Sequence, residues 1–149
     1  MLDKRVKLAV LIVPSTVLLL GAFYFQFIIG LKPCELCYLQ RWPHGLAILA
    51  FGALLVFPRH REKLWILTAL LTGASGVIAG YHMGVEAGLW MASCDSPGLG
   101  GKLATHLLNI ATTPACNVVQ WSFLSLSMAT WNAIISIASC VISLSIRKL

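Results

Sequence analysis

Four long stretches without a charged side chain constrain the fold of this sequence most strongly. No Asp, Glu, Lys or Arg occurs between Lys7 and Lys32, between Arg41 and Arg59, between Lys63 and Glu86, or from Leu103 to Ile146. An α-helix needs about 20 apolar residues to cross the roughly 30 Å hydrocarbon layer of a membrane. A helix also satisfies its own backbone hydrogen bonds, which lipid cannot do. The stretches therefore predict four membrane-spanning helices.

The composition excludes an ordinary soluble domain. Of the 149 residues, 58% are hydrophobic and 11% are charged, whereas about 25% are charged in a typical soluble domain. A soluble globule of this size would have to build much of its surface from apolar side chains. We therefore predict an all-α membrane protein, a four-transmembrane-helix bundle that forms a single integral membrane domain over residues 1–149.

The spans are expected at residues 8–31, 43–57, 64–85 and 121–146. The second begins with Pro43, which suits the first position of a helix, and stops at Pro58. Loops 32–42 and 92–120 then lie together on one side of the membrane. The longer loop carries Leu103, Leu107 and Leu108 at helical spacing, which predicts a short surface helix.

The basic residues predict the orientation of the spans. The net charge of +6 would by itself suggest a nucleic acid partner, but Lys and Arg in short loops are retained on the cytoplasmic side of a membrane. Most of the basic residues fall on one side of the spans: Lys4, Arg5, Lys7, Arg59, Arg61, Lys63, Arg147 and Lys148. Both termini are therefore expected in the cytoplasm and the two loops outside. The first apolar stretch exceeds the roughly 7–15 residues of a signal peptide, so it is expected to remain as a helix.

Four of the five cysteines lie in the two outside loops. Cys34 and Cys37 form a C-x-x-C pair, a spacing that brings two sulfurs within bonding distance and often lowers the pKa of one thiol. A small ring of this kind favours exchange over permanent bracing. Cys94 and Cys116 lie at opposite ends of the longer loop and could be joined across it. Cys140 lies in the fourth span, where we expect a small buried hydrophobic residue.

The loop cysteines leave several interpretations open. A disulfide between Cys94 and Cys116 could simply staple the loop of a structural membrane protein. Zinc could bind four thiols, although only one half has the short spacing of metal ligands, and haem attachment would need a His where Tyr38 stands. In a redox interpretation, electrons enter from a soluble dithiol at one pair, pass by exchange to the other, and leave to a lipid-soluble oxidant such as a quinone.

Two further residues lie close to the first pair in the predicted topology. Arg41 follows Cys37 by four positions, so in a helix the two share a face. Its guanidinium would stabilise a Cys37 thiolate and donate to a quinone carbonyl, or it would extend to the membrane surface. His82, near the outer end of the third span, could bind a quinone oxygen or serve the structure. Fewer features single out His44, at the start of the second span, and His106, in the surface helix.

Three motifs together resemble the bacterial disulfide bond formation protein B family. They are P-C-x-x-C-x-x-x-R over Pro33–Arg41, the pair Tyr81-His82 before the longer loop, and W-x-F-L-x-L-x-M over Trp121–Met128. The similarity extends over nearly the whole chain. It implies an enzyme of the bacterial inner membrane that reoxidises a periplasmic DsbA-like thioredoxin-fold oxidase and passes the electrons to ubiquinone or menaquinone. The relay from DsbA through DsbB to quinone is the known example of a periplasm kept oxidising kinetically.

The resemblance also implies an order for the cysteines, which would lie on the periplasmic side. By motif position, Cys94 is attacked by the partner's thiolate and forms a mixed disulfide. Cys116, released in that step, attacks Cys34. Cys37 then leaves as the thiolate that faces the quinone.

Arg41 matches the quinone-interacting arginine of the family, and His82 its quinone-proximal histidine. No metal site is expected. A vitamin K epoxide reductase-like protein is an alternative that also joins about four helices to C-x-x-C and loop cysteines. In those proteins the C-x-x-C is expected near the last span, whereas here it follows the first.

Overall fold

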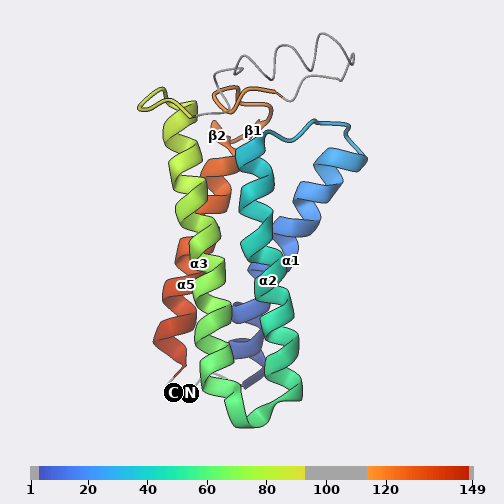
Figure 1. Ribbon diagram of the computed structural model, residues 1–149, viewed down its shortest axis with the longest axis vertical. Coiled ribbons are helices and arrows are strands. Elements are labelled where there is room, and N and C mark those ends of the chain that lie inside the picture. The colour runs from blue at the N-terminus through green and yellow to red at the C-terminus, as the bar shows by residue number, and fades with distance from the viewer. Residues whose placement is uncertain (1–3, 93–113, 148–149) are drawn as a thin grey trace.

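The computed structural model describes residues 4–92 and 114–147. This part of the chain is mostly helical, with four long helices side by side and a small hairpin at one end (Figure 1). The helices are α1 (Lys4–Phe27), α2 (Glu35–Val56), α3 (Arg61–Glu86) and α5 (Met128–Ile146); a 3₁₀ turn, η1 (Pro58–His60), joins α2 to α3, and strands β1 (Ser122–Phe123) and β2 (Leu126–Ser127) precede α5. The expected surface helix and Cys94 lie outside the described residues.

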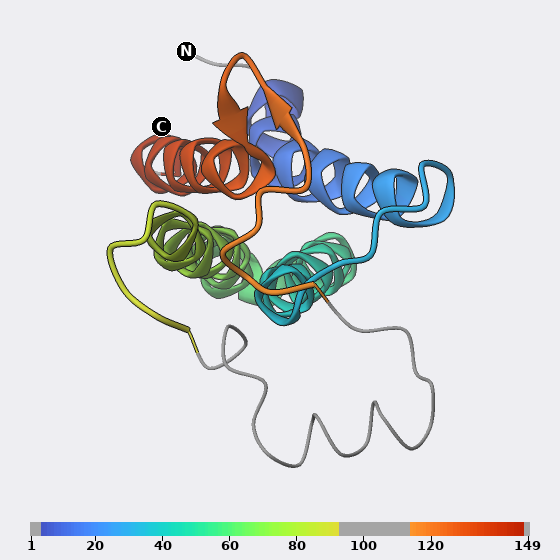
Figure 2. The ribbon, with the colours of Figure 1, turned by 90° about the horizontal axis from the view of Figure 1, so that it is seen from above.

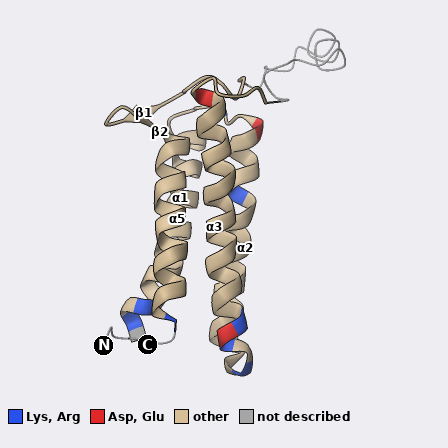
Figure 3. Ribbon diagram, turned by 90° about the vertical axis from the view of Figure 1, so that its left-hand side faces the viewer, with Lys and Arg blue, Asp and Glu red and all other residues tan. Residues whose placement is uncertain are grey.

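Three segments are long and apolar enough to cross a membrane. They are Arg5–Phe27, Pro58–Glu86 and Met128–Ile146. Helix α2 is also long, with 22 residues, but its first half carries Glu35, Gln40, Arg41 and His44, which lower its hydropathy. In the described chain, most Lys and Arg residues gather at the end of the bundle where α1 begins and α5 ends, and Lys32 and Arg41 are the exceptions (Figure 3).

Helix α2 begins at Glu35, so the prediction that the second helix starts at Pro43 was wrong. The sulfur of Cys34 caps the helix by accepting the backbone N–H of Cys37 at 3.2 Å. Pro43 lies inside the helix, where it removes one backbone donor. The earlier cap outweighs this loss, and it places Cys37, Arg41 and His44 on one continuous helix.

The prediction that the last helix starts at 121 was also wrong, because residues 122–127 form a hairpin. Ser122 pairs with Ser127 and Phe123 with Leu126. Leu124 and Ser125 at the turn have φ of 51° and 63°, as in a type I′ turn. The Ser127 side chain then caps α5 by accepting the backbone N–H of Thr130 at 3.1 Å, a strong signal for a helix start.

Small residues let α3 pack closely against α5. Seen from above, α1 and α5 form one side of the bundle and α2 and α3 the other (Figure 2). A Cβ built at Gly73 would lie 2.8 Å from the sulfur of Cys140, and one at Gly76 would lie 2.8 Å from Cγ1 and 3.1 Å from the backbone nitrogen of Ile137. Close backbone approach of this kind is common between membrane helices, where packing drives association.

We expect Gly76→Ala to destabilise the protein by about 1–2 kcal/mol, since the added methyl group overpacks the α3–α5 contact. Gly80 on the same helix is the matched control, because a Cβ there meets nothing within 4 Å. Thermal unfolding in detergent should therefore show a lower Tm for Gly76→Ala and no loss for Gly80→Ala. Equal Tm values for the two variants would contradict this account of the packing.

Candidate functional site

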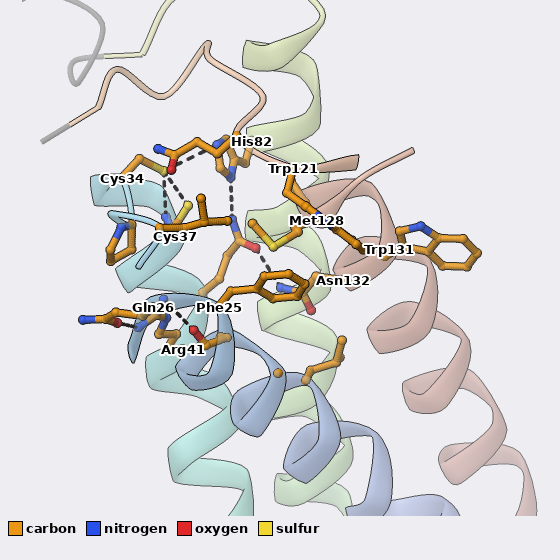
Figure 4. Close-up of a pocket in the computed structure, with 18 of the residues that line it drawn as sticks. Phe25, Gln26, Cys34, Cys37, Arg41, His82, Trp121, Met128, Trp131 and Asn132 are labelled. Atoms are coloured by element: carbon orange, nitrogen blue, oxygen red, sulfur yellow. Dashed lines mark hydrogen bonds between the residues drawn. The ribbon is translucent and has the colours of Figure 1, made fainter. Parts of the chain in front are cut away.

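The C-x-x-C pair lies at the start of α2, at the hairpin end of the bundle (Figure 4). The Sγ atoms of Cys34 and Cys37 are 2.6 Å apart, and neither cysteine is disulfide-bonded. Cys34, which precedes α2, is buried, and its hydrogen bond with Cys37 together with this burial raises the pKa of its thiol. A single negative charge on the reduced pair therefore resides on Cys37, next to the arginine one turn further along α2.

The structure brings Cys116 from the longer loop to this pair. Cys116 is fully buried and packs in one cluster with Cys34, Val85 and Ala92. It is disulfide-bonded, whereas Cys94, which could be joined to it across the longer loop, lies outside the described residues. Three of the four cysteines predicted to react are thus described, and all three lie together.

His82 lies between the cysteines, with both ring nitrogens engaged. Its Nδ1 is 2.8 Å from Nε2 of Gln40. Its Nε2 is 3.1 Å from the carbonyl oxygen of Cys116 and 3.6 Å from Sγ of Cys34. The sequence predicted a contact with a quinone for this residue; the contacts with two cysteines are an addition that the sequence did not reveal.

An apolar cavity of about 410 Å³ opens beside the pair, between α1, α2, α5 and the hairpin (Figure 4). Its apolar walls include Val17, Leu18, Ala22, Phe25, Trp121 and Met128. Cys37, Arg41 and His82 also line it. A mostly apolar cavity with a few convergent polar groups is typical of a small-molecule site.

Arg41 is held in the cavity wall by groups of α1 and α2. Its Nη1 donates to Oε1 of Gln26, and its Nη2 donates to the carbonyl oxygen of Ala22 at 3.4 Å. Its guanidinium carbon lies 5.5 Å from the ring centroid of Phe23 and 5.1 Å from that of Tyr38. Its Nε is buried and has no hydrogen-bond partner among the described residues. A buried donor without a partner is costly, so the position of Arg41 in the cavity wall is not explained by the hydrogen bonds of the described residues alone.

Sequence analysis missed a network of buried polar side chains between the helices. His44, which was expected to contribute little, is 2% exposed. Its Nδ1 is 3.1 Å from Oγ of Ser15, and its Nε2 is 2.9 Å from Oγ of Ser75 and 3.1 Å from Oδ1 of Asn132. Asn132 in turn reaches Gln40. The available signal was the presence of polar residues inside apolar spans, which are expensive unless they pair with one another.

Cys34, Cys37 and His82 also form a group of metal-ligand types. Their ligand atoms all lie within 4.8 Å of one another, a spacing that a tetrahedral ion could use. The carbonyl of Cys116 can only accept a hydrogen bond, so Nε2 of His82 carries a proton there and offers no lone pair. This arrangement favours thiol chemistry over metal binding.

Comparison with known proteins identifies the family. The model of the family described as "Disulfide bond formation protein DsbB" matches residues 4–146. Disulfide bond formation protein B 2 of Pseudomonas entomophila (strain L48) is 30% identical over 129 residues, which cover 79% of this chain and 75% of that protein. Disulfide bond formation protein B of Nitrosococcus oceani is 32% identical over 140 residues, covering 83% and 79%. No solved structure matches the chain. The chain therefore belongs to the disulfide bond formation protein DsbB family, as its motifs predicted.

Proposed function

We propose that this disulfide-forming redox enzyme reoxidises a periplasmic DsbA-like thioredoxin-fold protein and passes the electrons through two cysteine pairs to a membrane quinone. The family supports disulfide formation as the activity. The observation that carries the rest is the burial of Cys116 against Cys34, whose sulfur is 2.6 Å from that of Cys37 at the edge of an apolar cavity. Cys116, the Cys34–Cys37 pair and an apolar cavity therefore lie next to one another, which supports a transfer of electrons in this order.

The proposal includes a bundle of four transmembrane helices in the bacterial inner membrane, with α2 as the fourth span. Its 22 residues extend about 33 Å at about 1.5 Å per residue, enough for the hydrocarbon layer. Apart from Lys32 and Arg41, the basic residues of the described chain gather at the end of the bundle opposite the C-x-x-C pair (Figure 3). Under the positive-inside rule, this puts the termini in the cytoplasm and the cysteines on the periplasmic side.

The electrons would move by two disulfide exchanges. The partner's thiolate attacks Cys94 of a Cys94–Cys116 disulfide, which forms a mixed disulfide and releases Cys116 as a thiolate. Cys116 then attacks Cys34, so that a Cys34–Cys116 bond forms and the Cys34–Cys37 bond breaks, with its electron pair on Cys37. The partner's second thiol resolves the mixed disulfide, and Cys94 then attacks Cys116 and releases Cys34. The partner leaves oxidised, and the Cys34–Cys37 pair holds the two electrons.

The cavity beside Cys37 fits a quinone in size and chemistry. A bound quinone would accept the two electrons and two protons that return Cys34 and Cys37 to a disulfide. The apolar walls suit a flat, lipid-soluble ring, and the guanidinium of Arg41 in the cavity wall would donate to a carbonyl oxygen. The Arg41 guanidinium also stabilises negative charge on Cys37 one helical turn away.

The purified protein in detergent should consume quinone absorbance when a reduced DsbA-like protein is added, and Cys94→Ser should reduce this rate to background. Cys140→Ser is the matched control and should keep the activity, since Cys140 lies on α5 outside the site. The opposing result is quinone that stays oxidised while all four loop cysteines resist alkylation. Those cysteines would then be structural staples, and the proposed function would be wrong.

A further inference from the structure

We propose that Gln40, held by Asn132, is a positioning residue that fixes which nitrogen of His82 carries the proton, so that His82 can tether Cys116 beside Cys34. This inference rests on the proposed function, because it concerns the transfer between the two cysteine pairs. The residues come from three helices and the longer loop: Asn132 from α5, Gln40 from α2, and His82 from α3.

The hydrogen bonds form a chain in which each side chain donates to the next. Nδ2 of Asn132 donates to Oε1 of Gln40 at 2.7 Å. Nε2 of Gln40 donates to Nδ1 of His82 at 2.8 Å. Nε2 of His82 donates to the carbonyl oxygen of Cys116 at 3.1 Å. An amide has one donor end and one acceptor end, so the direction at one link sets the direction at the next.

At the Asn132 end of this series of hydrogen bonds, contacts with His44 fix the direction of donation. Ser75 donates its only hydroxyl hydrogen to the backbone carbonyl of Gln40 at 2.8 Å, because a carbonyl cannot donate. The Oγ of Ser75 must then accept from Nε2 of His44, 2.9 Å away. The same N–H faces Asn132, so the amide oxygen of Asn132 points to His44 at 3.1 Å and its NH₂ group points to Gln40.

At the Cys116 end of the series, the hydrogen bond from His82 independently requires the same direction of donation. The carbonyl of Cys116 also can only accept, so Nε2 of His82 must be the protonated nitrogen. Two backbone carbonyls, one at each end, thus agree on a single proton arrangement. In the other tautomer, the lone pair of Nε2 would face the carbonyl oxygen of Cys116, and the tether would be lost.

The tether matters because of where His82 lies. Its Nε2 is 3.1 Å from the carbonyl of the attacking residue, Cys116, and 3.6 Å from the sulfur under attack, that of Cys34. Cys116 follows a long loop, so a hydrogen bond that holds its backbone beside Cys34 lowers the conformational entropy cost of bringing the two sulfurs together. Gln40 therefore acts on the transfer through His82, not by contact with the sulfurs.

The titratable groups that face His82 in the described structure are few. Glu86, one turn along α3, has its Oε1 3.9 Å from Nε2. Cys34 and Cys37 face it from the start of α2, and Cys116 from the longer loop. Helix α5 contributes the neutral Asn132 through Gln40. A carboxylate at residue 40 would therefore add a negative charge next to Nδ1 of His82, where the amide of Gln40 now lies.

The test is Gln40→Glu, because a carboxylate accepts where the amide donates. Nδ1 of His82 must then carry a proton. The lone pair of Nε2 in a neutral His82 would then face the carbonyl oxygen of Cys116, and that hydrogen bond would be lost. We expect Cys34–Cys116 disulfide formation, measured by rapid quench and alkylation, to be about tenfold slower in the variant. Ser139→Ala, which removes a buried hydroxyl bonded only within α5, should keep the wild-type rate.

Ring ¹⁵N NMR of the resting protein reads the tautomer directly and separates this inference from the proposed function. The wild type should show a protonated Nε2 and a bare Nδ1 for His82, assigned by its loss in His82→Asn. Gln40→Met should give a mixture of tautomers. Asn132→Asp, which cannot donate to Gln40, should shift the proton toward Nδ1 without touching His82. A protonated Nδ1 in the wild type, or a Gln40→Glu variant that forms the Cys34–Cys116 disulfide at the wild-type rate, would overturn the inference even if quinone reduction proceeds as proposed.

Discussion

Replacing Cys37 with serine should abolish quinone reduction while the mixed disulfide between the partner and Cys94 still forms. The hydroxyl of serine cannot form a disulfide with Cys34, so Cys116, once released, has no bond to attack. Entry at Cys94 does not involve Cys37 and should continue. Quinone absorbance should therefore decay only at the rate seen without enzyme, while non-reducing electrophoresis shows the complex with the partner.

The trapped complex makes this prediction specific to the order of the cysteines. Cys116→Ala has no Cys94–Cys116 disulfide for a reduced partner to attack, so it is tested with the oxidised partner. The Cys94 thiolate should attack the partner's disulfide and form the same complex, with the partner's second cysteine leaving as the thiolate. Cys140→Ser should form no more complex than the wild type and should keep full quinone reduction. If Cys116→Ala forms no complex with an oxidised DsbA-like protein, Cys94 is not the residue that exchanges with the partner, and the assigned order fails. If the Cys37→Ser variant still reduced quinone, Cys37 would not be the residue that transfers electrons to the quinone.

The helices could be predicted from the sequence because a charge-free apolar stretch has few other structures open to it. Their ends could not, because local hydrogen bonds set them. A sulfur cap at Cys34 starts α2 before Pro43, and the turn at Leu124 and Ser125 converts a predicted helical segment into a hairpin. Neither a cysteine cap nor a type I′ turn made of Leu and Ser is a signal that residue preferences supply.

The reacting residues were predictable in kind, since two cysteine pairs on one side of a membrane and an arginine one turn after C-x-x-C are visible in the chain. The buried network was not. Gln40, His44 and Asn132 come from two helices, and their contacts depend on how those helices are rotated toward each other. Periodicity gives the apolar face of a helix but not the register between two helices, so a polar residue in a span signals a partner without naming it.

Arg41→Lys should raise the KM for quinone about tenfold, with a smaller effect on the rate at saturating quinone. The guanidinium binds Gln26 and Ala22 through its two terminal nitrogens and lies in the cavity wall, and its buried Nε has no partner among the described residues. A lysine side chain has one ammonium group at the end of a flexible stem. It therefore cannot bind Gln26 and Ala22 and also donate to a quinone carbonyl. Losing one charge-assisted hydrogen bond to the bound quinone corresponds to about tenfold in affinity.

The KM measurement distinguishes binding from stability when it is paired with two further variants. Gln26→Ala removes one anchor of the guanidinium and should raise the KM in the same direction by less. Arg59→Lys changes an exposed arginine at the opposite end of the bundle and should leave the KM unchanged. If Arg41→Lys also leaves it unchanged, the guanidinium serves only to join α1 to α2. A quinone would then have to bind beside Cys37 without a hydrogen bond from Arg41.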